Sequence, residues 1–224
     1  MDQEIIVEAI GKHLDAIETY VNAISILAIA ATWAGIQRSS EIEVLGMKFK
    51  RRHAFWVAAG LYLIANMTIL ILFLRIGDLV ALLDASHAVK GATLLATHSW
   101  VLNPFSYFGN TSIARAHSGE GYGLLIVTWW LCNASLSTLV DDKRNHAAAL
   151  LLALFLVIGL GAMLAMSRVD MIVVDGLRTA APALYSVVVD TATERYVGTV
   201  LGIVVGALVF VVANKLQQRF RETR

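Results

Sequence analysis

The sequence predicts an all-α polytopic membrane protein with about five transmembrane helices, and four at the fewest. Hydrophobic residues make up 58% of the 224 positions and charged residues only 16%, well below the quarter or so of soluble domains. The mean hydropathy is +0.68. Five uncharged windows each approach the roughly 20 residues that a helix needs to cross the bilayer core.

The chain begins with a predicted amphipathic helix over residues 1–18. Apolar residues recur there at steps of three and four positions: Ile6, Ile10, Leu14, Ile17 and Val21. Charged residues occupy the opposite face: Glu4, Glu8, Lys12 and Asp15. No proline separates this helix from the first predicted span, so the two can form one long helix.

The five predicted spans belong to a single membrane domain, 1–224. They cover residues 19–37, 54–74, 121–140, 147–167 and 196–214. A charge at the membrane centre costs at least about 2.5 kcal/mol, and none of these windows contains one. Segments 76–120 and 169–195 are predicted to lie outside the membrane, with residues 76–102 forming a surface helix or extending the second span. If residues 171–189 also enter the membrane, the number of spans changes and the C-terminus can change sides.

Charge placement predicts the orientation. Most of the lysines and arginines fall in loop 38–53, in the turn 141–146 and after residue 214, all on one side of a five-span topology. The positive-inside rule makes that side cytoplasmic. The N-terminus is then outside and the C-terminus cytoplasmic. The single cysteine and the short loops fit the inner (cytoplasmic) membrane of a bacterium.

The cytoplasmic loop contains the sequence EIEVLGMKFKRR over residues 41–52. Its alternation predicts a short strand pair with a turn at Gly46. Four basic residues end the segment: Lys48, Lys50, Arg51 and Arg52. These charges either set the orientation and contact anionic lipid headgroups, or they form a docking patch for a soluble protein partner.

Two predicted spans have similar flanks. Arg51-x-His53-Ala54 precedes the second span and Arg144-x-His146-Ala147 precedes the fourth, while Arg75 and Arg168 follow them. The offset between the two sets is 93 residues throughout. This spacing indicates either two duplicated, parallel units or a coincidence between two spans with basic flanks.

The sequence offers few groups for chemistry. A net charge of +1 argues against a nucleic-acid partner, and one cysteine excludes a cysteine-based zinc cluster. His87 and His98 could share an outer metal site with Asp84, but isolated histidines on amphipathic helices are more often structural. Ser86 and His87 beside Asp84 resemble a triad, yet neighbours on a helix are expected to point apart. We therefore expect no catalytic residue, no metal and no cofactor, and a protein that is not an enzyme.

The fifth predicted span carries a stripe of glycines at four-residue spacing: Gly198, Gly202 and Gly206. Without Cβ atoms, these positions allow two helix backbones to approach closely. The stripe can serve packing within the chain, contact between copies, or the lining of an oligomeric pore.

These features favour a non-enzymatic integral membrane subunit, an oligomeric scaffold or sensor that recruits a cytoplasmic partner. Small membrane subunits of this build occur in bacterial defence and stress systems, which is an analogy at the level of fold only. The alternative is a channel- or pore-forming protein assembled through the fifth span. In both cases the expected partners are the lipid bilayer and further copies of the chain.

Overall fold

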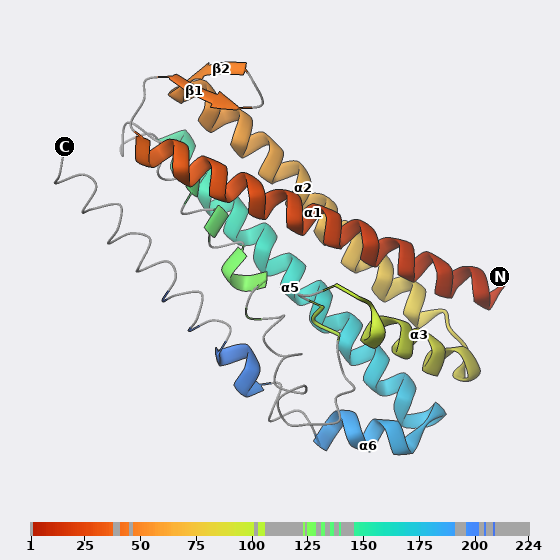
Figure 1. Ribbon diagram of the computed structural model, residues 1–224. Coiled ribbons are helices and arrows are strands. Elements are labelled where there is room, and N and C mark those ends of the chain that lie inside the picture. Colours follow the sequence, from red (N-terminus) through yellow and green to blue (C-terminus); the bar gives the residue numbers. More distant parts are fainter. Residues whose placement is uncertain are drawn as a thin grey trace.

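The computed structural model describes residues 2–37, 41–44, 47–100, 103–105, 146–190 and 196–201, with short pieces at 123, 125–128, 131–132, 135–136, 139, 204 and 208. In this part of the chain helices predominate, and one short hairpin joins the first two. Three long helices run side by side in Figure 1: α1 (Gln3–Gln37), α2 (Arg51–Ala81) and α5 (His146–Ala180).

Helix α1 confirms the expectation of one long helix, since it continues from the amphipathic segment into the first predicted span. Its 35 residues extend about 52 Å at 1.5 Å per residue, well beyond the ~30 Å hydrocarbon core. The predicted face pattern is also confirmed. The buried residues of its first half are the apolar series Ile6, Ile10, Leu14, Ile17 and Val21.

The strands β1 (Glu41–Val44) and β2 (Met47–Lys50) form the predicted antiparallel pair between α1 and α2. Helix α2 then runs on past the predicted span to Ala81. After a short turn, α3 (Ala85–Thr97) follows. The second helix is thus extended and a separate helix comes after it, whereas a position on the outer surface stays a prediction.

Helix α5 does not end with the predicted span at residue 167 but continues unbroken to Ala180. The physical reason is that the first proline after residue 104 is Pro182, and the residue before a proline is disfavoured in helical conformation. Ala181 is accordingly non-helical, and α6 (Pro182–Asp190) begins at the proline.

Three described helices are long and apolar enough to cross a membrane: Gln3–Thr32, His53–Ala81 and Ala153–Ala180. They contain most of the first, second and fourth predicted spans. The third and fifth predicted spans, 121–140 and 196–214, lie largely outside the described residues. The number of five spans and the orientation therefore stay predictions.

The exposed faces of α2 and α5 change from apolar to polar towards their C-terminal ends, whereas that of α1 changes from polar to apolar. On α2 the exposed Ile64 and Leu74 give way to the exposed Arg75 and Asp78. On α5 the exposed Leu164 is followed by Arg168. Large exposed apolar surface is stable against lipid rather than water. We call the polar part beyond these changes the cap: residues 3–18 of α1, residues 75–100 from the end of α2 through α3, residues 168–180 of α5, and α6.

Helices α2 and α5 run parallel and form the most extensive helix pair among the described elements (Figure 1). Small residues allow this closeness, since a Cβ on Gly161 would lie 3.5 Å from a methyl group of Leu70. At the cap, Arg168 Nη2 lies 3.2 Å from Asp78 Oδ1. A parallel run of these helices agrees with the duplication hypothesis, which stays a prediction.

Candidate functional site

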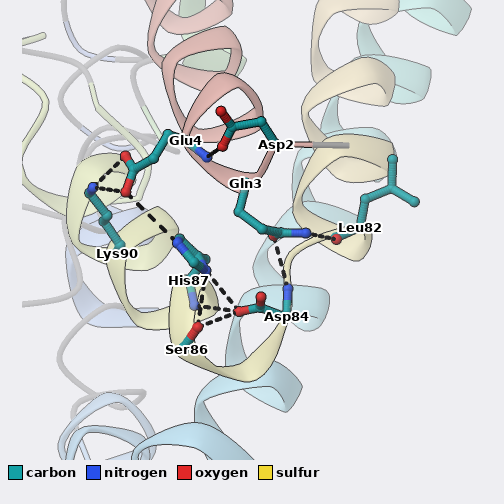
Figure 2. Close-up of polar contacts among 8 residues, drawn as sticks. All are labelled: Asp2, Gln3, Glu4, Leu82, Asp84, Ser86, His87 and Lys90. Atoms are coloured by element: carbon teal, nitrogen blue, oxygen red, sulfur yellow. Dashed lines mark hydrogen bonds and ion pairs between the residues drawn. The ribbon is translucent and has the colours of Figure 1, made fainter.

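The cap contains a group of polar side chains that joins α1, the α2–α3 turn and α3 (Figure 2). We call it the cap cluster: Gln3, Glu4, Asp84, Ser86, His87 and Lys90. The Gln3 amide makes two contacts with the turn. Its Oε1 accepts from the Asp84 backbone N–H at 3.1 Å, and its Nε2 donates to the Leu82 carbonyl at 3.4 Å. One side chain thus fastens the start of α1 to the α2–α3 turn.

Asp84 is the N-cap of α3. Its Oδ1 accepts from the His87 backbone N–H at 2.9 Å, which satisfies one of the unpaired donors of the first helical turn. The same oxygen accepts from the Ser86 hydroxyl at 2.6 Å and lies 2.9 Å from His87 Nδ1. The Ser86 hydroxyl first, and the His87 side chain and backbone next, hold the pKa of the Asp84 carboxyl well below its usual range.

Glu4 of α1 supplies the charge that faces α3. Lys90 Nζ donates to Glu4 Oε1 at 2.6 Å, and His87 Nε2 lies 3.8 Å from the same oxygen (Figure 2). The Lys90 and Glu4 side chains are both more than half exposed, at 52% and 58%. Such exposed pairs contribute about 0.2–1 kcal/mol. Their role is to set how α3 lies on α1 rather than to stabilise the fold strongly.

The expectation that Ser86 and His87 point apart was wrong, because Ser86 Oγ lies 3.0 Å from His87 Nδ1. The N-cap turn brings them together at the first turn of α3. The arrangement is still not that of a triad. Ser86 and Asp84 both contact the same imidazole nitrogen, Nδ1, whereas a triad needs the nucleophile and the orienting acid on different nitrogens.

A second histidine ties the far end of α3 to α1. His98 Nε2 lies 3.0 Å from Asp15 Oδ1, and the His98 side chain is only 9% exposed. His98 Nδ1 accepts from the Trp100 backbone N–H at 3.2 Å. Because Nδ1 is an acceptor, the proton of the neutral imidazole resides on Nε2 and is donated to Asp15. His87 contacts Asp84 and Glu4, whereas His98 contacts Asp15, so the two histidines do not come together with Asp84 in one site.

Within the described residues, one group of side chains could in principle hold a metal ion. Ligand atoms of Asp15, Glu18 and His98 all lie within 4.8 Å of one another. A metal on His98 Nε2 would require the proton on Nδ1, since a ligating histidine donates its other N–H to an acceptor. Here Nδ1 faces the N–H of Trp100, another donor. The residues therefore do not fit a metal site in this arrangement.

Two of the four predicted docking residues lie in the described part of the hairpin. Lys48 and Lys50 are exposed on β2. The strand register pairs Glu43 with Lys48 and Glu41 with Lys50, so each lysine position has an acidic position opposite. Opposite charges at such cross-strand positions attract. The side chains of Arg51 and Arg52, in the first turn of α2, lie outside the described residues.

Only one residue of the glycine stripe can be located. Gly198 is buried in the helical stretch 196–201. Gly202 and Gly206 lie outside the described residues, so the stripe as a contact surface stays a prediction.

A buried chain of polar contacts, not predicted from the sequence, joins the apolar part of α2 to Ser135 and Cys132. Tyr62 Oη lies 2.9 Å from Ser135 Oγ, and the Ser135 hydroxyl donates to the Cys132 carbonyl at 2.8 Å. One turn on, the buried Asn66 donates to the Tyr62 carbonyl at 2.8 Å. A tyrosine in mid-span, away from the interface that tyrosine favours, was the available signal.

No protein-family model, curated protein or solved structure matches this chain. Function is therefore argued from the cap, the helices and the hairpin alone.

Proposed function

We propose that the chain is a non-enzymatic, multi-pass membrane subunit that acts as a sensor or scaffold, receiving a signal at the cap and presenting the hairpin to a cytoplasmic protein. One observation carries this proposal. Helices α1 and α2 each run unbroken from the cap to the hairpin. A change in how the cap holds these helices would therefore reach the hairpin through two rigid elements.

The contacts in the cap support such a role. They join segments far apart in the sequence, as between Gln3 and Asp84 or between Asp15 and His98. They are also mostly exposed and polar, so they can respond to the solution outside without unfolding the apolar helices. A bacterial inner membrane, an outside N-terminus and assembly of several copies belong to this proposal.

The hairpin defines the test for a partner. A tagged protein is purified from mildly solubilised membranes, and the proteins that accompany it are compared with those of a Lys48→Glu, Lys50→Glu variant. A matched control keeps both positive charges at the same positions, Lys48→Arg and Lys50→Arg. We expect one or more specific proteins to be lost with the hairpin variant and kept with the control. An identical protein set in all three samples counts against the hairpin as a docking surface.

The channel remains the second candidate, on the strength of Gly198, a buried glycine within the fifth predicted span. In a planar bilayer, a channel formed through this span would give discrete currents that change in Gly202→Leu. A silent bilayer from folded, oligomeric protein would favour the sensor or scaffold.

A further inference from the structure

The turn that follows α3 is closed by His98. Besides the Trp100–His98 bond, other hydrogen bonds hold the described part of the turn, 98–100 and 103–105, and one of them runs from the Asn103 side chain to the His98 carbonyl at 3.4 Å. The Asn103 side chain donates to the Leu95 carbonyl at 2.7 Å, its Oδ1 accepts from the Phe105 N–H at 3.0 Å, and its backbone N–H donates to the Trp100 carbonyl at 3.0 Å. His98 thus provides the one link in this set between the turn and α1.

Two aromatic residues of the turn are packed into the bundle. Phe105 is fully buried, and its ring meets that of Phe73 of α2 edge to face at 6.1 Å between centroids. Trp100 is 3% exposed, and its Nε1 is buried without a hydrogen-bond partner. Burial of this unpaired N–H group costs free energy in the folded position of Trp100. Other contacts must offset that cost, and the bond from the Trp100 backbone N–H to His98 is one of them.

Protonation of His98 conflicts with that bond. The neutral ring already has its proton on Nε2, directed at Asp15, so an added proton must go to Nδ1. Nδ1 would then face the Trp100 N–H, donor against donor, and the bond would be lost.

The groups that contact the His98 ring or its turn come from α1, from the turn itself and from α2. Its titratable neighbours are Asp15 and Glu18, both from α1. The turn itself contributes Trp100, and α2 packs against the turn through the apolar Phe73. The two ring nitrogens therefore face different partners, an acid of α1 at Nε2 and a backbone donor of the turn at Nδ1.

We propose that His98 is a pH-responsive latch: neutral His98 holds Trp100 in place through its backbone N–H, and protonation tightens His98 on Asp15 while releasing Trp100. The latch deepens the proposed sensor function, on which it rests, by naming the proton as the signal received at the cap. It acts as pH falls through the range in which histidines titrate, about pH 8 to 5.

The test uses the full chain labelled with 5-fluorotryptophan, reconstituted in lipid nanodiscs and followed by fluorine NMR, with the Trp100 signal assigned from Trp100→Phe. We expect the Trp100 signal to titrate between about pH 7.5 and 5.5. In His98→Asn it should stay at the closed position, because the Asn carbonyl oxygen can accept the same N–H two residues on at every pH. A matched control, His87→Asn, removes the other cap histidine and should titrate like the native protein.

A Trp100 signal that does not move with pH in the native protein, or that moves equally in His98→Asn, overturns the latch. Nitrogen NMR of the histidine rings provides a second measurement, since it distinguishes the two neutral tautomers. At neutral pH the latch requires the proton of His98 on Nε2, and a proton on Nδ1 contradicts it. If the hairpin variant loses a partner but the Trp100 signal does not move with pH, the latch is refuted and the sensor proposal stands. If the Trp100 signal moves with pH but no partner depends on the hairpin, the latch stands and the docking role of the hairpin is refuted.

Discussion

The contrast between the apolar helices and the cap can be tested with two exposed isoleucines. Ile64 of α2 is 64% exposed and Ile5 of α1 is 59% exposed, so a reagent has similar steric access to both. Ile64 is the midpoint of the predicted span 54–74, which places it about 15 Å from either end at 1.5 Å per residue. Ile5 lies in the cap. The two positions should differ only in whether lipid or water surrounds them.

The perturbation is Ile64→Cys or Ile5→Cys, with labelling by a water-soluble maleimide in sealed vesicles. The reagent reacts with the thiolate. An acidic charge at the membrane centre costs about 2.5–3.5 kcal/mol, and 1.36 kcal/mol corresponds to one unit of pKa. The thiolate population at Ile64→Cys should therefore fall by roughly 70- to 400-fold relative to a thiol in water. Exclusion of the polar reagent from lipid adds to this difference.

The native Cys132 is 1% exposed, and Cys132→Ala provides a background without it. Unfolding in SDS should make both introduced cysteines react at similar rates, which checks that each is present. Equal labelling rates in vesicles would refute the assignment of α2 to the membrane. Met171→Cys, at a position 66% exposed, extends the test to the end of α5. Fast labelling there places residue 171 in water, and slow labelling places it in the membrane.

Three further predictions concern stability and pH. Tyr62→Phe should lower the thermal midpoint in detergent by a few degrees, since it removes a buried hydrogen bond of about 0.6–1.7 kcal/mol; an unchanged midpoint would mean that the bond contributes nothing. Gly161→Leu should cost about 1–3 kcal/mol by overpacking against α2, whereas Gly161→Ala should be tolerated in the same unfolding assay; equal effects would contradict the close approach. The bonds from Ser86 and His87 lower the pKa of Asp84, so the N-cap of α3 should stay intact through the ordinary carboxyl range and be lost only as pH falls through the lowered pKa. Hydrogen exchange of the α3 amides measures this loss. An exchange rate that rises already near about pH 4, as expected for Asp84→Asn, would show that the carboxyl pKa is not lowered.

Much of the helical framework could be predicted from the sequence, because it depends on local chemistry. The three- and four-residue spacing of Ile6 to Val21 determines which face of α1 is buried. The absence of proline up to Pro104 lets α1 and α2 run long. The alternation around Gly46 predicted the hairpin, whose strands the structure confirms. Uninterrupted apolar windows indicated the helices that can cross a membrane.

The cap and the buried polar chain could not be predicted, because their contacts join residues far apart in the sequence. Gln3 and Asp84 are 81 positions apart, and His98 and Asp15 are 83 apart. Nothing local distinguishes Gln3 from an ordinary polar residue of a first turn, and the tautomer of His98 depends on a backbone N–H in the following turn.

The sequence by itself determined the composition, the long apolar helices and the amphipathic face of α1, since each follows from the period and polarity of neighbouring residues. Only the tertiary structure decided that α5 continues past Arg168 to pair with Asp78, that Ser86 and His87 converge on one oxygen of Asp84, and that the lysines of β2 face glutamate positions. The physical reason is the same in each case. A hydrogen bond or ion pair is fixed by the distance between atoms, and that distance is set by how the helices and strands pack.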